Sequence, residues 1–259
     1  MGYGDLVNLS LIPGDVGASA VQNIGAYGVE AQDVIEEVRG ISLKDGSTQL
    51  WKHDDCKYGY RQSIFKEELW GKYAITRVTF RLSKHFEPKL HYGGLVKAIE
   101  QAGLSPDTLT AEQLRQVIID IRRAKLPDPA VEGNAGSFFK NPVVSKEKAE
   151  RLLLDYPTMP HYPAEEGKVK LAAGWLIEQA GWKGKSLGPA AVHDRQALVL
   201  VNKGGASGRD IQRLQEAIKK DVYERFDINL EPEVNFIASP NSSPKGNRRS
   251  TEVKDINCK

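Results

Sequence analysis

Three polar residues of the sequence have side chains that can take part in catalysis. Arg61 carries a planar cationic fork that suits negative charge on a carboxylate. Ser137 offers a weakly acidic hydroxyl, which can give up a proton only to a strongly basic atom with cations nearby. Glu233 shares one face of a predicted strand with Glu231, so the alternation cannot choose between them. By residue type alone, a structural interpretation of each is better. Arg61 would be a surface arginine, Ser137 a loop serine bonded to nearby backbone, and both glutamates part of a solvated strand face.

Other kinds of centre have weaker support. A serine hydrolase built on Ser137 lacks a Gly-x-Ser-x-Gly turn, and no histidine is tied to this serine by sequence. The five histidines are scattered, and Cys56 and Cys258 form no metal motif, so we predict no metal site. His193, before a buried strand, is interpreted as a structural histidine, and Trp175 as a core residue.

Residues 12–30 are rich in glycine and small side chains, which permits close approach to a ligand or, equally, tight turns. The spacing is not that of the Gly-x-Gly-x-x-Gly dinucleotide motif. The net charge of +2, from 36 basic and 34 acidic residues, gives no argument for binding nucleic acid. No apolar run reaches the roughly 20 residues that span a bilayer. We predict a cytoplasmic protein, a monomer, with no nucleic-acid or membrane partner.

The elements that position these residues are mixed helices and strands. Thr110 with Gln113 forms a capping box for a helix over 110–123, and Ser145 and Ser207 can cap helices over 146–155 and 208–225. A further helix over 171–180 ends at Gly181. Strands are predicted over 34–51, 72–82, 197–201 and 228–237. Without a regular βαβ alternation, the fold class is α+β.

Five segments, in this order along the chain, resemble UDP-N-acetylenolpyruvoylglucosamine reductases, also called UDP-N-acetylmuramate dehydrogenases. They are IPGDVGASAVQNIGAYG (12–28), YGYRQSIF (58–65), KLPDP with GNAGSFFKNP (125–129, 133–142), KLAAGWL (170–176) and LEPEVNFI (230–237). The stretch HYGGL (91–95) is similar to the subgroup with an extra tyrosine-bearing loop over the substrate.

The resemblance implies a cell-wall enzyme in which NADPH reduces FAD. The reduced flavin then delivers hydride to the enolpyruvyl double bond of UDP-N-acetylglucosamine enolpyruvate, giving UDP-N-acetylmuramate. The implied layout is the latter half of a flavin-binding (vanillyl-alcohol-oxidase/PCMH-like) domain over 1–102 and an α+β substrate domain over 103–227. Residues 228–237 would be a strand returning to the flavin side, and 238–259 a disordered tail.

The same resemblance assigns the site residues. Arg61, Ser137 and Glu233 match the catalytic positions, with Ser137 as proton donor, and we expect them to converge on one cavity. The matches to the substrate-binding positions are Tyr60, Tyr92, Lys125 and Asn141. Plausible flavin-side residues are Gly25, Tyr27, Gly28 and Arg122. Lys125 also has a simpler interpretation, because a lysine at a helix C-terminus favours the helix dipole, and Tyr92 could simply be packed.

One departure is large. Family members carry about a hundred residues before the first matched segment, including the Gly-rich turn that holds the FAD pyrophosphate. We therefore expect this chain by itself not to hold FAD tightly and not to turn over. The alternative hypothesis is a non-catalytic UDP-sugar-binding remnant without flavin, which would purify as a colourless protein.

Overall fold

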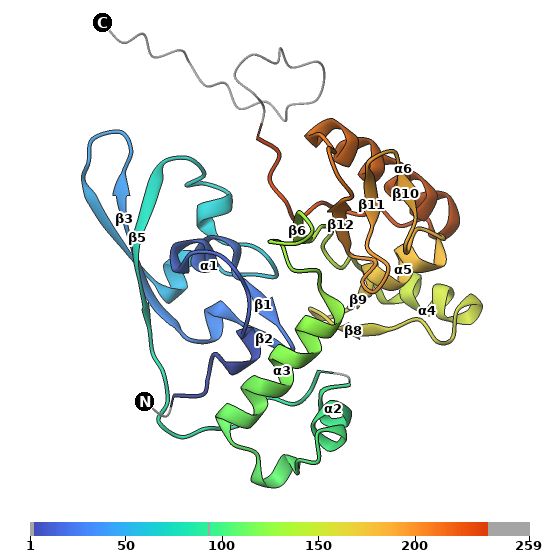
Figure 1. The fold of residues 1–259 in the computed structure, drawn as a ribbon. Coiled ribbons are helices and arrows are strands. Elements are labelled where there is room, and N and C mark those ends of the chain that lie inside the picture. The colour runs from blue at the N-terminus through green and yellow to red at the C-terminus, as the bar shows by residue number, and fades with distance from the viewer. Residues whose placement is uncertain (1–2, 93, 238–259) are drawn as a thin grey trace, which may run out of the picture.

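The computed structural model describes residues 3–92 and 94–237, and its fold is α+β, as predicted (Figure 1). Every strand pair is antiparallel. The strands form sheets in the orders β4-β3-β5, β10-β11-β12-β6, β7-β9-β8 and β1-β2. Short 3-10 helices lie at Val7–Leu9, Ala31–Asp33, His53–Cys56, Ile64–Lys66 and Pro106–Thr108.

The first sheet supports the N-terminal part of the site. It consists of β3 (Ile35–Ser42), β4 (Thr48–Lys52) and β5 (Tyr73–Phe80), with helix α1 (Val16–Gln22) against β5. Its buried cluster includes Ala20, Val38 and Phe65. The single strand predicted over 34–51 is wrong. The chain reverses between β3 and β4 at Asp45-Gly46, where Gly46 has φ +74°, a value that glycine adopts without a steric penalty.

The molecule has two larger parts: an N-terminal part around the sheet β4-β3-β5 and a C-terminal part around the sheet β10-β11-β12-β6. Helix α3 (Ala111–Lys125) runs beside the shorter α2 (Leu95–Gln101) below these two parts (Figure 1). The capping box is present: Gln113 N donates to Thr110 Oγ1 and Thr110 N to Gln113 Oε1. One apolar cluster joins Val7, α2 and α3. It crosses the boundary at 102/103, so the division into 1–102 and 103–227 stays a prediction.

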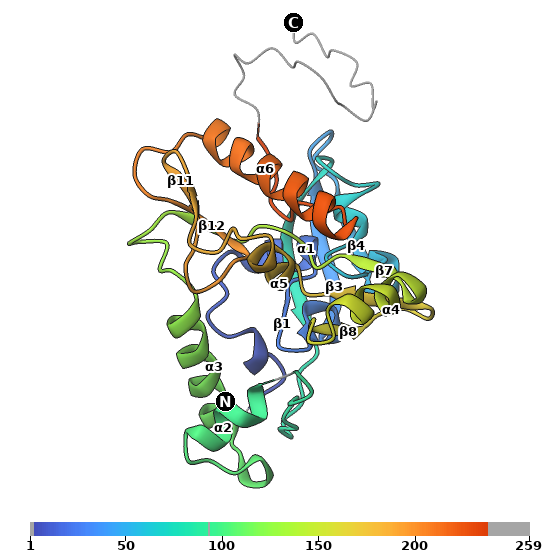
Figure 2. The same ribbon diagram turned by 90° about the vertical axis from the view of Figure 1, so that its right-hand side faces the viewer.

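The C-terminal part packs around the largest buried cluster, and α6 (Gly208–Phe226) lies against α5 (Ala173–Gln179) and β11 (Figure 2). Ser145 and Ser207 accept hydrogen bonds from the first turns of α4 (Lys146–Asp155) and α6, as predicted. The other strands are short: β1 Gly25–Ala26, β2 Val29–Glu30, β6 Asn134–Ser137, β7 Val143–Ser145, β8 His161–Pro163, β9 Lys168–Leu171, β10 Ser186–Leu187, β11 Ala190–Val192 and β12 Val199–Asn202.

Residues 228–237 are extended, but the predicted strand is wrong. The segment makes one isolated bridge, Pro232 to Phe139, with Lys140 N donating to Glu231 O and Glu233 N to Phe138 O. Pro232 has no N–H to continue a ladder, which limits the pairing to this short stretch. The segment therefore joins the C-terminal part through its backbone. The predicted tail, 238–259, lies outside the described residues.

No helix within the described ranges combines the length and apolar character needed to cross a bilayer. Across the same ranges, no three His, Cys, Asp or Glu side chains are grouped so that they could hold a metal ion.

Candidate functional site

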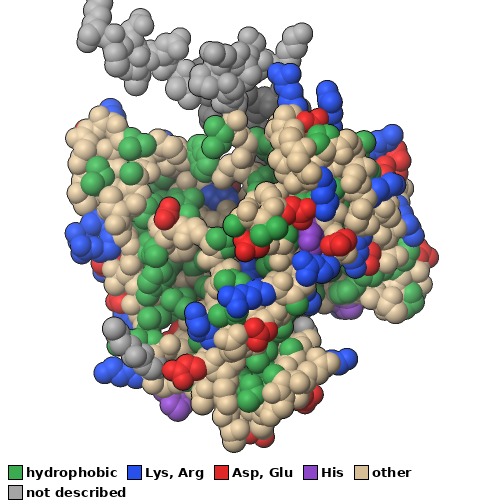
Figure 3. Space-filling model, viewed as in Figure 1, with side chains coloured by type: hydrophobic (Ala, Val, Ile, Leu, Met, Phe, Trp, Pro, Cys, Tyr) green, Lys and Arg blue, Asp and Glu red, His purple; other side chains and the backbone are tan. Residues whose placement is uncertain are grey.

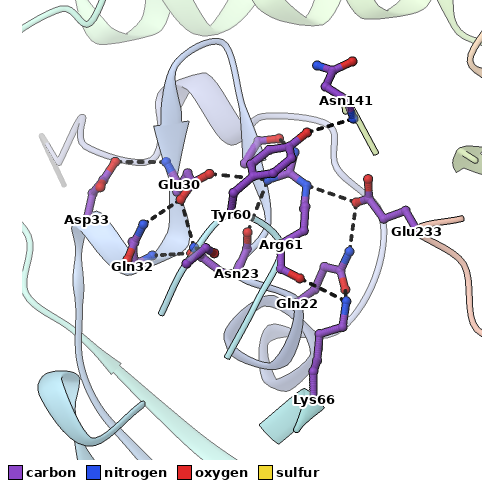
Figure 4. A network of polar contacts seen from close by, with 12 residues as sticks. Gln22, Asn23, Glu30, Gln32, Asp33, Tyr60, Arg61, Lys66, Asn141 and Glu233 are labelled. Carbon is purple, nitrogen blue, oxygen red and sulfur yellow. Dashed lines mark hydrogen bonds and ion pairs between the residues drawn. The ribbon is translucent and has the colours of Figure 1, made fainter. Parts of the chain in front are cut away.

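Arg61 is the centre of a polar network between the two larger parts (Figure 4). It has φ +55°, a left-handed conformation that costs a non-glycine residue about 1–2 kcal/mol. Its Nε donates to Glu233 Oε1 (3.0 Å), its Nη2 to Gly25 O (2.6 Å) and its Nη1 to Asn23 O (3.3 Å). These bonds fix the guanidinium plane. Each terminal nitrogen carries two hydrogens, so among the described residues one N–H of each is left to donate to a ligand.

Glu233 approaches Arg61 from the far end of the chain. Both side chains are largely buried, 15% exposed for Arg61 and 20% for Glu233, so their ion pair is less screened than a surface pair. Glu231, the alternative glutamate, is 76% exposed and lies 3.6 Å from Lys140 Nζ. The structure thus pairs Glu233, and not Glu231, with Arg61, a distinction that the strand alternation could not make.

The segment at the end of α1 holds this pair in place, and sequence reasoning missed it. Asn23 is fully buried and left-handed, with Nδ2 donating to Glu30 Oε2 and Gly59 O, and Oδ1 accepting from Gln32 N. Gln22 Nε2 donates to Glu233 Oε1 at 2.9 Å. The sequence offered one signal for this role: Gln22 and Asn23 are two adjacent amide side chains inside a stretch of small apolar residues.

Tyr60 connects Arg61 to the C-terminal part. Its ring centroid is 5.2 Å from Arg61 Cζ and 4.4 Å from Lys170 Nζ, and its hydroxyl accepts from Asn141 N (3.3 Å). Asn141 Oδ1 in turn accepts from Ala173 N at the start of α5. Burial raises the pKa of Tyr60, and Arg61 opposes that shift. Two predicted substrate residues therefore lie together beside Arg61.

Tyr92 lies in an aromatic row. Its ring stacks on Tyr162 of β8 at 5.7 Å and meets Tyr27 edge-on at 5.6 Å. Burial raises the pKa of both Tyr92 and Tyr27, and the charge of Arg122 works against the shift at Tyr27. Arg122 Nε is buried without a hydrogen-bond partner among the described residues. An anion would satisfy such a group.

Two glycines flank this arrangement. Gly25 packs directly against Arg61: a Cβ there would lie 2.7 Å from Arg61 Nη1 and 2.9 Å from Glu30 Cγ. Gly28 has φ +79° and follows Tyr27, which is itself left-handed at +49°. Gly25 thus brings its backbone against Arg61, whereas Gly28 lies nearer to Tyr92.

Ser137 and Lys125 lie less close to the centre. Ser137 is exposed at the end of β6, opposite Val199, and makes no side-chain hydrogen bond within the described ranges. It directly precedes Phe138, whose carbonyl accepts from Glu233 N at 2.7 Å, so the backbones of the two residues are neighbours. Lys125 is exposed at the C-terminal end of α3. The ion pair places Arg61 beside Glu233, whereas the convergence of Arg61, Ser137 and Glu233 on one cavity stays a prediction.

Half-buried cations add to the positive character of the site. Burial lowers the pKa of Lys66, and Lys140 nearby lowers it further. Burial also lowers the pKa of Lys170. Figure 3 shows a hollow between the two larger parts, with basic side chains inside it. The arrangement can receive an anionic ligand.

His193 and Trp175 have the structural surroundings expected of them. His193 is 4% exposed, and its Nδ1 accepts from Arg195 N at 3.2 Å. Trp175 packs against the largest apolar cluster.

Comparison with known proteins places this geometry in context. Residues 128–237 match the family model described as UDP-N-acetylenolpyruvoylglucosamine reductase, C-terminal domain. A crystal structure of UDP-N-acetylenolpyruvylglucosamine reductase from Thermus caldophilus superimposes with a TM-score of 0.58 at 23% identity, over 90% of this chain and 64% of that one. At that identity, the likeness shows the fold.

Sequence relatives extend the likeness beyond the fold. UDP-N-acetylenolpyruvoylglucosamine reductase of Neisseria meningitidis is 53% identical over 239 residues, 92% of this chain and 68% of that protein. The proteins of that name from Dechloromonas aromatica and Bacteroides fragilis are 48% and 52% identical, with 70% and 68% of their lengths covered. The chain spans about two thirds of the length of these relatives. It belongs to the UDP-N-acetylenolpyruvoylglucosamine reductase family.

Proposed function

We propose that this chain carries the substrate-reducing site of a bacterial cytoplasmic enzyme that converts UDP-N-acetylglucosamine enolpyruvate to UDP-N-acetylmuramate with NADPH and FAD. The observation that carries the proposal is the Arg61–Glu233 ion pair, formed by segments at opposite ends of the chain, both within stretches that resemble the family. The family relationship supports the choice of reaction.

Arg61 is the group that binds the substrate carboxylate in this proposal. When hydride adds to one carbon of the enolpyruvyl double bond, the electron pair moves toward the carboxylate, which becomes enolate-like. A guanidinium already fixed by Glu233, Gly25 and Asn23 stabilises that charge without reorganising during the reaction.

Ser137 is the proposed proton donor. Its hydroxyl proton goes to the carbon beside the carboxylate, and the exposed side chain regains a proton from water. The hydrogen bond from Glu233 N to Phe138 O supports this role, because it links the backbone next to Ser137 to the backbone of Glu233.

Tyr60, Tyr92, Lys125 and Asn141 are the proposed contacts of the nucleotide and sugar. Asn141 uses its amide oxygen to bond Ala173 N, which leaves its Nδ2 to donate to a ligand. The exposed ammonium of Lys125 can meet a diphosphate at the end of α3.

Tyr27, Gly25, Gly28 and Arg122 fit the flavin side of the proposal. The buried Nε of Arg122, which has no hydrogen-bond partner within 3–92 and 94–237, suits an anionic part of FAD, and the backbone at Gly28 can approach a ligand closely. When bound, FAD would supply the hydride, with NADPH as its source. The monomeric state stays a prediction.

A binding experiment tests the role of Arg61 without any cofactor. UDP-N-acetylglucosamine enolpyruvate and UDP-N-acetylglucosamine, which lacks the carboxylate, are titrated by calorimetry into this chain and into its Arg61→Met variant. We expect the wild type to prefer the enolpyruvyl compound and the variant to lose that preference. Equal affinities in the wild type would contradict the proposal. Adding FAD and following flavin fluorescence tests the separate expectation that this chain holds FAD weakly.

A further inference from the structure

Gln22, the last residue of α1, lies between Glu233 and Lys66 in the polar network and bonds both (Figure 4). Its Nε2 donates to Glu233 Oε1 at 2.9 Å, and its Oε1 accepts from Lys66 Nζ at 2.6 Å. Because an ammonium can only donate, Lys66 fixes which end of the Gln22 amide faces it. The NH2 end is thereby directed at Glu233.

Lys66 is itself held from a second side. Its Nζ donates to Arg61 O at 3.1 Å, so one ammonium ties the Gln22 side chain to the left-handed backbone of Arg61. Burial and the charge of Lys140 lower its pKa. Glu233 and Glu67 favour its charged form.

Glu233 receives both donors on the same oxygen. Gln22 Nε2 and Arg61 Nε each bond Oε1, while no side chain or backbone group of residues 3–92 and 94–237 donates to Oε2. Two donors that converge from different segments restrict rotation of a carboxylate about its last bond, whereas one donor leaves it free to turn. Oε2 is therefore the oxygen available to a ligand.

We propose that Gln22, oriented by Lys66, is a positioning residue that fixes the Glu233 carboxylate against Arg61 and presents Oε2 to the substrate. This inference rests on the function proposed above and adds a residue to it. Its neighbour Asn23 differs in role, because its buried amide bonds only Glu30, Gly59 and Gln32 and so fixes the turn itself.

The first test is a double-mutant cycle on substrate reduction, in a full-length family member that holds FAD, with each substitution made at the position that matches this chain. Gln22→Met keeps the length of the side chain and removes both hydrogen bonds. We expect it to slow substrate reduction about 10- to 100-fold, because small misplacements of catalytic groups cost up to about 10² in rate. KM should change little. In a Glu233→Met background, which removes the oxygen that Gln22 binds, the same substitution should have almost no further effect. Equal effects in both backgrounds would overturn the proposal.

The second test needs neither flavin nor turnover. Exchange of the Arg61 Nε proton with solvent is followed by NMR in arginine-labelled protein. Gln22→Met and Lys66→Met should each speed this exchange severalfold, and Lys66→Arg, which keeps a donor, should restore much of the protection. Gln49→Met, at an exposed position on β4, is the control and should leave it unchanged. Unchanged exchange in Gln22→Met would refute the positioning role. A wild type that shows protection but does not prefer the enolpyruvyl compound in the calorimetric titration would count against the proposed function instead.

Discussion

The two larger parts of the molecule hold their side chains still by different means. The C-terminal part rests on an extensive apolar cluster, in which α5 and α6 bury Leu176, Leu214 and Ile218 completely. The site segments of the N-terminal part lie in short turns, where Asn23, Tyr27 and Arg61 all have positive φ and side-chain hydrogen bonds replace regular structure. The C-terminal part thus fixes its side chains by apolar packing, whereas the turns place charged groups through hydrogen bonds.

The largest expected effect concerns catalysis without loss of stability. In a full-length family member that holds FAD, the substitution that matches Ser137→Ala should slow substrate reduction about 10²- to 10⁴-fold, the typical cost of losing a positioned proton donor. Flavin reduction by NADPH should stay nearly unchanged, as stopped-flow absorbance would show. Because Ser137 is exposed, the melting temperature should not change. Ser186→Ala, another exposed strand serine in the same sheet, is the control, and equal slowing of both half-reactions would contradict the assignment.

The second prediction tests the apolar part. Leu176→Ala should lower the free energy of unfolding by about 2–5 kcal/mol, because it leaves a cavity among fully buried neighbours. Leu154→Ala, on α4 with an 82% exposed side chain, should change it by less than about 0.5 kcal/mol. Urea denaturation measures both. Equal costs would show that α5 does not anchor this cluster.

The third prediction concerns the turn. Asn23→Gly keeps the left-handed backbone relaxed but leaves buried partners unsatisfied, so it should cost about 1–3 kcal/mol. Asn23→Ala should cost about 1 kcal/mol more, because alanine is strained at φ +48°. Denaturation curves for the two variants separate hydrogen bonding from backbone strain. If alanine proved the milder substitution, the left-handed conformation would not be maintained in solution.

The last effect is a dependence on pH, which is absent near neutrality and appears only above about pH 9. Burial raises the pKa of the Cys56 thiol from 9.0 to about 11. The unfolded chain loses this proton first, so the stabilisation is complete below pH 9 and is lost as pH rises toward about 11. The slope should be at most about 1.4 kcal/mol per pH unit. Cys56→Ala should flatten this part of the stability profile in urea titrations. An unchanged slope would mean that the thiol titrates alike in both states.

Local signals account for what the sequence predicts well. The caps of α3, α4 and α6 depend on residues three positions apart. Thr110, Ser145 and Ser207 can therefore be recognised as capping residues without tertiary information. The β3–β4 reversal had its own Asp-Gly signal, which the strand-like composition on both sides obscured. At 228–237, alternation predicted a strand, but Pro232 and the available partner backbone decided the pairing.

The site required information that alternation and propensity do not contain. Glu231 and Glu233 have the same periodicity, and only the tertiary position of Arg61 distinguishes them. The resemblance to known reductases selected Arg61 and Glu233, which the structure places in contact. It did not identify Gln22 or Lys66, because their importance lies in bonds to other side chains rather than in a motif.

The contact between Gly25 and Arg61 has an evolutionary consequence. Any side chain at position 25 would collide with the guanidinium, because even a Cβ would lie 2.7 Å from Nη1. The carbonyl of Gly25 also accepts a hydrogen bond from Arg61, so the two positions constrain each other both sterically and chemically. Across homologues they should therefore change together: a lineage that replaces one should have replaced the other, and a lineage that keeps the arginine should keep the glycine.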